Sequence, residues 1–191
     1  MLIKGGELEP SVDPAVARRL IESVALGDPG LEADRGRILE LLAIHGDIAV
    51  RTSRPGHLTG SAFVVDHDRR RCVLLFHHKL QRWLQPGGHA DGEMNLAAVA
   101  WREATEETGI EGLLIDPRPV DLDIHRVAPP AEDAHLHLDV RFVVVAPPAA
   151  VLVRNHESDA LRWVDREELD DYQLDDGLRR LAARSWAALG R

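Results

Sequence analysis

The sequence predicts an α/β protein: a three-layer α/β/α sandwich around a central mixed sheet, with a helical extension at the N-terminus. Stretches with the apolar spacing of helices lie before, within and after a series of alternating, strand-like segments. Aromatic residues make up only 4% of the chain, so Val, Leu, Ile and Ala must form the core, which suits helices packed on a sheet. With 191 residues and 45% hydrophobic content, the chain can bury one sizeable core.

The first part of the chain is expected to form a helical hairpin. Asp13 is a candidate N-cap and Pro14 occupies the first helical position, so a helix is predicted over residues 13–26. The stretch "GDPG" interrupts this helix. A second run of apolar residues, marked from Ile38 onward, indicates another helix that stops before Gly46.

Near "SRPGH" the sequence changes from helix-like to strand-like segments, which divides the chain into two predicted units. Residues 1–50 form the helical hairpin, packed on the core, and residues 51–191 form the main α/β domain. The hairpin presents no basic recognition face, which argues against a separate binding module. We expect it to be a packing attachment or a contact in a homodimer.

The main domain is predicted to begin with two strands, "LTGSAFVVD" and "RCVLLFHHK", which flank the turn "HDRR" as in an antiparallel hairpin. Apolar and polar residues alternate over residues 120–127 and 135–145, and "ALRWV" indicates one more strand. An amphipathic helix between Leu174 and Leu189 closes the chain, with acidic residues at its positive end.

Charge and composition exclude several classes of partner. The formal net charge is −9, which argues against a surface for a nucleic-acid polymer. The N-terminus has no apolar signal core, and no stretch reaches the roughly 18 apolar residues of a membrane span. The single cysteine, Cys72, cannot form an internal disulfide and is expected to be buried in a strand. A cytoplasmic setting without a membrane partner is therefore expected.

The segment between Asn95 and Gly109 predicts a short helix with crowded acidic groups at one end. Asn95 is a candidate N-cap and Gly109 a candidate left-handed C-cap. Glu103, Glu106 and Glu107 stand at i, i+3 and i+4, so they share one face near the negative end of the helix dipole. A solvated acidic face is one interpretation of this pattern. The other interpretation is a metal site, because a hard divalent cation such as Mg²⁺ or Mn²⁺ would offset the repulsion between the carboxylates.

The residues around this helix resemble the Nudix box, G-x5-E-x7-R-E-U-x-E-E-x-G-U, where U is a bulky apolar residue. The matching residues are Gly88, Arg102, Glu103, Glu106, Glu107, Gly109 and Ile110. Two positions depart from the pattern: Ala104 stands at an apolar place, and Met94 stands where the first Glu is expected, one residue after Glu93. The resemblance spans roughly residues 57–170 and leaves the N-terminal hairpin outside.

The resemblance implies a Nudix hydrolase, which hydrolyses a nucleoside diphosphate linked to another group X. Glu103, Glu106, Glu107 and the carbonyl of Gly88 would then hold Mg²⁺ or Mn²⁺, which would neutralise the phosphates and activate water for in-line attack on phosphorus. In this family the first Glu braces the loop, often against the box arginine. The departure at Met94 should therefore affect the loop and Arg102 more than metal binding, and Met94→Glu should tighten the loop.

The general base is left open by the sequence. The resemblance implies either a box glutamate or a Glu on a loop after the strands, for which Glu157 is the candidate and Glu132 and Asp133 are alternatives. Trp83 either stacks on a nucleobase or covers the sheet.

The ten histidines show no zinc-type spacing such as HExxH, so zinc is disfavoured. The strand over residues 135–145 presents a polar wall of His135, His137, Asp139 and Arg141 opposite its apolar face. His135 and His137, with His89, could contact phosphate or base. Ordinary, partly exposed histidines are the alternative.

Two rival functions remain at this point. One is a catalytically weak or inactive Nudix-like sensor that binds a nucleotide, although all three ligand glutamates are present. The other is an isomerase of the isopentenyl-diphosphate type, which needs a catalytic cysteine, whereas Cys72 stands in a predicted strand. The identity of X is not predicted.

Overall fold

The computed structural model describes residues 1–27, 29–128, 133–156 and 158–190. Within them, nine strands form one mixed sheet. The strands are β1 (Ile3–Lys4), β2 (Gly56–Val65), β3 (Arg71–His77), β4 (Arg82–Leu84), β5 (Gly87–His89), β6 (Leu114–Ile115), β7 (Asp121–Val127), β8 (His135–Val145) and β9 (Ser158–Asp165). The helices are α1 (Pro14–Glu22), α2 (Pro29–Ile44), α3 (Leu96–Thr108) and α4 (Asp176–Leu189), with short 3-10 turns at Gly5–Glu7 and Arg166–Asp171.

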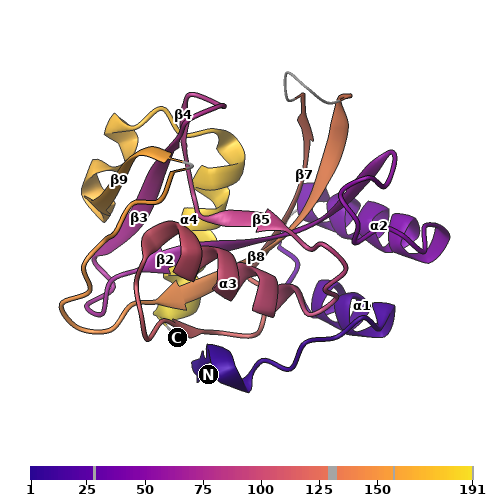
Figure 1. Ribbon diagram of the computed structural model, residues 1–191, viewed down its shortest axis with the longest axis horizontal. Coiled ribbons are helices and arrows are strands. Elements are labelled where there is room, and N and C mark those ends of the chain that lie inside the picture. The colour runs from indigo at the N-terminus through magenta and orange to yellow at the C-terminus, as the bar shows by residue number, and fades with distance from the viewer. Residues whose placement is uncertain (28, 129–132, 157, 191) are drawn as a thin grey trace.

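The centre of the sheet is the parallel pair β2 and β8, which runs in register from Gly56↔Leu136 to Val65↔Val145. All other pairings are antiparallel. Two strands pair with the edge of β2 that faces away from β8: β3 pairs with the C-terminal end of β2, and β5 pairs with its middle. In the same way, β6 and β7 pair with different parts of β8. Figure 1 shows β5 beside β2, above α3 in that view.

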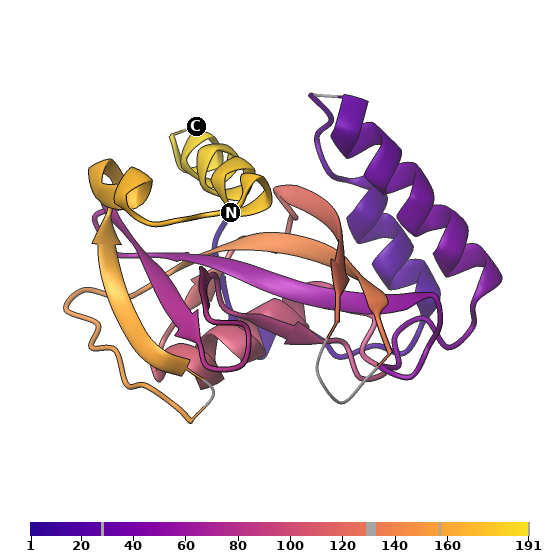
Figure 2. The ribbon, with the colours of Figure 1, turned by 90° about the horizontal axis from the view of Figure 1, so that it is seen from above.

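Helices cover both faces of the sheet, as predicted. Helix α3 packs on one face of β2, and α4 lies on the opposite face (Figures 1 and 2). Alternate residues of β2 follow this division: Ala62 and Val64 belong to the core under α3, whereas Phe63 contacts Trp186 of α4 edge to face. The period of two along a strand therefore sets two apolar layers, one on each side. The predicted mixed α/β sandwich is confirmed.

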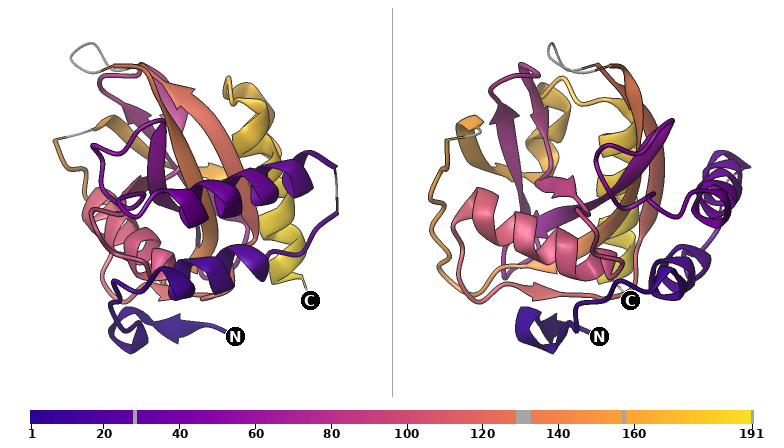
Figure 3. Two further views of the ribbon diagram at one scale, coloured as in Figure 1. Left: turned by 90° about the vertical axis from the view of Figure 1, so that its right-hand side faces the viewer. Right: turned by 45° about the vertical axis from the view of Figure 1, so that its right-hand side comes forward.

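The N-terminal segment is joined to the sheet as well as packed on it. Strand β1 pairs with β6, and α2 packs against β7 at the end of the sheet (Figure 3). The buried side chains of both helices belong to the same apolar core as α3. Helix α1 begins where predicted, because Asp13 accepts a hydrogen bond from the Ala15 N–H, but it ends at Glu22 rather than at 26. The division of the chain at residue 50 stays a prediction.

Helix α2 begins at Pro29, earlier than its apolar run suggested, because proline is well suited to a first helical turn. The strands of two or three residues were not anticipated, since so short a segment shows no alternation. Cys72 is fully buried in β3, as expected, and burial raises the pKa of its thiol to about 12. Across the described ranges, no helix combines the length and apolar character needed to cross a bilayer.

Candidate active site

The site forms where the short strand β5 passes the C-terminal half of α3. An added Cβ at Gly88 would lie 2.5 Å from the carboxylate of Glu103, so only a glycine leaves room for that side chain. Helix α3 ends at Thr108, and its C-cap residue, Gly109, has a left-handed φ of 65°, which glycine permits. Both glycines of the sequence pattern therefore have a geometric role.

Glu103 and Glu107 are both held against β5. Arg102 donates from Nη2 to Oε1 of Glu103 at 2.8 Å and to the carbonyl of His89 at 3.0 Å, so the guanidinium ties helix and strand together. Glu107 is only 5% exposed, and its Oε2 accepts the Gly87 N–H at 2.8 Å. These contacts fix two carboxylates on the side of α3 that faces β5.

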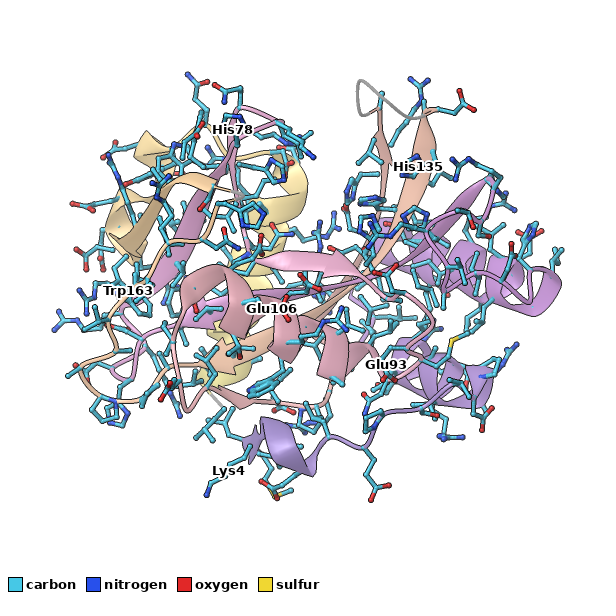
Figure 4. The ribbon with its side chains drawn as sticks, viewed as in Figure 1. Lys4, His78, Glu93, Glu106, His135 and Trp163 are labelled. Atoms are coloured by element: carbon cyan, nitrogen blue, oxygen red, sulfur yellow. The ribbon has the colours of Figure 1, made fainter. Side chains whose placement is uncertain are left out.

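Glu106 lies between these two residues in sequence but is exposed. Figure 4 shows it near the middle of the molecule, on α3 beside β5. The structure therefore combines two carboxylates held by hydrogen bonds with one that is accessible from solvent. Such a set can bind a cation that also reaches an external ligand.

Of the three candidates for a general base on a loop, the structure describes only Asp133. Glu157 and Glu132 lie outside the described residues. Asn155 is described, and its Nδ2 lies 3.5 Å from the carbonyl of Glu106, so the chain just before position 157 passes the end of α3. Asp133 is exposed before β8, where its carbonyl bonds Nδ1 of His135.

The loop before α3 is braced by Glu93. Its Oε1 accepts the N–H groups of Asn95 and Ser11, at 2.7 and 2.8 Å. Asn95 is the N-cap residue of α3, but its side chain donates to the Glu9 carbonyl instead of capping the helix. The loop is thus fastened to the N-terminal segment, and Figure 4 shows Glu93 on that side of the molecule.

Met94 points into the core, where it is 4% exposed. The burial of Met94 argues against the expectation that Met94→Glu tightens the loop, because the new carboxylate would replace a buried thioether. We expect Met94→Glu to lower the free energy of unfolding by on the order of 3 kcal/mol. Urea denaturation, with the exposed Val12→Glu as a matched control, measures this. Equal stability of the two variants would contradict the burial of Met94.

Gly88→Ala should impair the site without unfolding the protein. The new methyl group must displace the Glu103 carboxylate, and a misplacement of about 1 Å at a reacting centre can reduce kcat about 100-fold. Gly36→Ala is the matched control, since nothing lies within 4 Å of its added Cβ. Turnover of both variants, measured on one substrate, gives the comparison. Unchanged kcat in Gly88→Ala would show that the position of Glu103 is unimportant.

The polar wall of β8 lies on the α4 side of the sheet, and most of it is buried. Arg141 is 4% exposed and donates to Asp139 at 2.7 Å, to Asp123 at 3.0 Å and to Asp121 at 3.3 Å. Burial alone would lower the pKa of Arg141, but these carboxylates raise it. Arg180 of α4 binds Asp121 and Asp123 from the other side. This part of the wall is therefore an internal charge network.

The other end of the wall is a group of histidines, the imidazole cluster: His57, His89, His125, His135 and His137. Ring centroids of neighbouring members lie 4.8–5.4 Å apart. Burial is the main cause that lowers the pKa of His57 to about 4 and of His137 to about 2, with neighbouring histidines adding to it. Both rings are therefore neutral at pH 7. His57 was not singled out from the sequence, because only the sheet register brings it opposite His137.

Trp83 is half-buried on β4, where its ring meets Phe76 and Tyr172 edge to face. The guanidinium of Arg162 lies over the same ring, 5.4 Å from its centroid. These contacts favour the interpretation that Trp83 covers the sheet.

The fold and site together define an α/β protein with a glycine-lined group of carboxylates at the end of a helix. Residues 56–184 match the family described as NUDIX domain, which is more than half of the chain. The chain belongs to the Nudix family. The family match thus confirms the predicted resemblance, and with it the enzyme class of a Nudix pyrophosphohydrolase. No curated protein matches the sequence.

Solved structures share this fold at low sequence identity. An Ap4A hydrolase from C. elegans, in a binary complex, has a TM-score of 0.57 at 17% identity, over 70% of this chain and 97% of its own. A Nudix family hydrolase from Clostridium perfringens has a TM-score of 0.52 at 21% identity, over 70% and 97%. The Nudix domain of Shewanella oneidensis NrtR, complexed with ADP ribose, has a TM-score of 0.50 at 19% identity, over 79% and 97%.

Proposed function

We propose that this protein hydrolyses a diphosphate linkage in a nucleoside diphosphate derivative, with a divalent cation held by the carboxylates of α3. The observation that carries the proposal is the packing of Glu103 on Gly88, with Glu107 bonded to Gly87 and Glu106 exposed beside them. Like charges gathered at the negative end of a helix repel one another, and the hydrogen bonds from Arg102 and Gly87 go to Glu103 and Glu107.

The donor set fits Mg²⁺ or Mn²⁺. All the candidate ligands are oxygens, which hard cations prefer, and the space beside Gly88 would be filled by any Cβ. Glu103, Glu106, Glu107 and the carbonyl of Gly88 would hold the ion. When bound, it would neutralise phosphate charge and lower the pKa of the attacking water.

The protein's own groups have distinct roles in this scheme. Arg102 positions Glu103 and β5 through its two hydrogen bonds, and the Gly87 N–H positions Glu107. As the water oxygen bonds to phosphorus and the bridging P–O bond breaks, a carboxylate takes a proton from that water. The carboxylate then passes the proton to the departing phosphate oxygen or to solvent. Glu106 and Glu107 are the described candidates for this base, and we retain Glu157 as the loop candidate.

The substrate is proposed to be a small nucleotide. The related structures include an Ap4A hydrolase and a domain bound to ADP ribose. Ap4A and ADP ribose are both compounds in which a nucleoside is linked through phosphates. The net charge of −9 supports the absence of a nucleic-acid polymer as partner. A cytoplasmic setting, the absence of a membrane partner and a homodimer stay predictions. Cys72 does not support the isomerase, because its thiol is buried with a raised pKa.

The proposal is tested by measuring phosphate or nucleotide release with Mg²⁺ or Mn²⁺. The panel comprises ADP-ribose, dinucleotides, dinucleoside polyphosphates, nucleoside triphosphates and CoA. We expect metal-dependent turnover of at least one compound, which EDTA abolishes. Binding of a nucleotide without turnover under any of these conditions would overturn the hydrolase and support the sensor.

A further inference from the structure

The imidazole cluster is assembled by four different strands. His57 of β2 and His125 of β7 stand directly opposite His137 of β8 on its two sides, and His89 of β5 stands opposite Thr59, two residues from His57. The side chains of His57, His89 and His137 therefore project from one face of three neighbouring strands. Figure 4 shows His135 on the same part of β8.

Three buried nitrogens at the centre of this cluster have no hydrogen-bond partner in the part of the chain that the structure describes. His57 is 1% exposed, and neither Nδ1 nor Nε2 has a hydrogen-bond partner among the described residues. The buried Nε2 of His137 has none there either. Burying such a group unsatisfied costs about 1–3 kcal/mol, and buried polar groups are normally bonded. A histidine that served only packing would be expected to bond through at least one nitrogen.

Three of these side chains point their nitrogens toward one another. One ring nitrogen from each of His57, His89 and His137 lies within 4.8 Å of the other two. Tetrahedral Zn²⁺ with nitrogen at 2.0–2.1 Å holds its ligands roughly 3.4 Å apart, so small ring rotations would bring these three nitrogens into place. Imidazole nitrogens are common ligands of transition metals.

We propose that His57, His89 and His137 form a second metal site, which binds one Zn²⁺-like transition-metal ion and is separate from the carboxylate site. Three imidazoles suit Zn²⁺, Co²⁺ or Ni²⁺, whereas Mg²⁺ requires oxygen ligands. Three protein ligands leave a fourth position open. The expectation that zinc is disfavoured rested on spacing within the sequence, and these ligands come from separate strands.

Neighbouring residues hold two of the three proposed ligands, His137 and His89, in position. Nδ1 of His125 bonds Asp123 at 2.8 Å, and the ring of His125 packs on His137. His125 is not one of the three ligands, but its ring, held by Asp123, limits the positions open to the His137 ring. The carbonyl of His89 accepts the bond from Arg102, which also binds Glu103. An ion on His89 would therefore hold β5 in place beside the carboxylates.

The test is a Co²⁺ titration of the full-length protein in excess Mg²⁺, which saturates the carboxylate site. We expect one equivalent to bind, with the visible absorption of four- or five-coordinate Co²⁺ and with paramagnetically shifted imidazole N–H signals in NMR spectra. His89→Ala should weaken binding by at least about tenfold. His67→Ala, which removes an exposed histidine of the β2–β3 turn, is the matched control and should bind as the wild type does.

The result is independent of enzymatic activity and therefore of the proposed function. If His89→Ala misfolds by circular dichroism, the wild-type NMR signals decide, because shifted imidazole N–H signals require histidine ligands. The absence of these signals, or unchanged binding by a folded His89→Ala, would overturn the proposal. Loss of Co²⁺ binding in Glu106→Gln alone would also overturn it, since the ion would then belong to the carboxylates. Water would be left as the partner of the His57 nitrogens.

Discussion

Replacing Glu106 by Gln is expected to lower turnover by about 100-fold or more while the protein stays folded. A metal ligand that stabilises charge in the transition state contributes several kcal/mol, and each 1.36 kcal/mol is about tenfold in rate. Glu106 is exposed, and its side chain is not part of either apolar core. Removing its charge also relieves repulsion near the negative end of α3, so stability should be unchanged or slightly raised.

Steady-state kinetics and thermal unfolding measure the two parts of this prediction. Glu111→Gln is the matched control, because Glu111 is an exposed acid just beyond the end of α3 and outside the site. It should keep wild-type kcat. Near-normal activity of Glu106→Gln would show that the assignment of the metal-binding face is wrong.

Replacing Arg141 by Met is expected to lower the free energy of unfolding by about 3–5 kcal/mol, the usual effect of breaking a buried ion pair. Arg141 is the only cation that the structure, within its described residues, places between Asp139, Asp123 and Asp121 and within hydrogen-bonding distance of all three. Met fills similar space but leaves the buried Asp139 without this partner, although Thr59 and Ser61 still donate to it.

Urea denaturation gives the change in stability, and Arg126→Met serves as control because Arg126 is exposed on β7. The control should change stability by less than about 0.5 kcal/mol, as surface substitutions usually do. If Arg141→Met is as stable as the control, the network contributes nothing to the fold.

Much of the fold follows from local sequence pattern. The alternation over residues 135–145 identifies β8, and the acidic helix between Asn95 and Gly109 matches α3 to the residue. The strands β1, β4, β5 and β6 have only two or three residues each, so their positions depend on pairing with longer strands. Local pattern contains no information about such partners.

The two parts of the site differ in the same way. The carboxylates stand on one helix, so their shared face can be deduced from a spacing of three and four residues. The imidazole cluster depends on the registers of β5 and β8 with β2, which join residues up to 80 positions apart, as His57 and His137 are. The inward direction of Met94 likewise depends on the core that α3 covers.

The carboxylates of α3 are proposed to bind a hard cation, which in turn binds a diphosphate. A crystal structure with Mn²⁺ and a non-hydrolysable dinucleotide, read by the anomalous signal of manganese, tests this proposal most directly. We predict an anomalous peak among Glu103, Glu106 and Glu107, in contact with the diphosphate. Side chains that point apart into solvent, with no peak between them at saturating Mn²⁺, would contradict the claim.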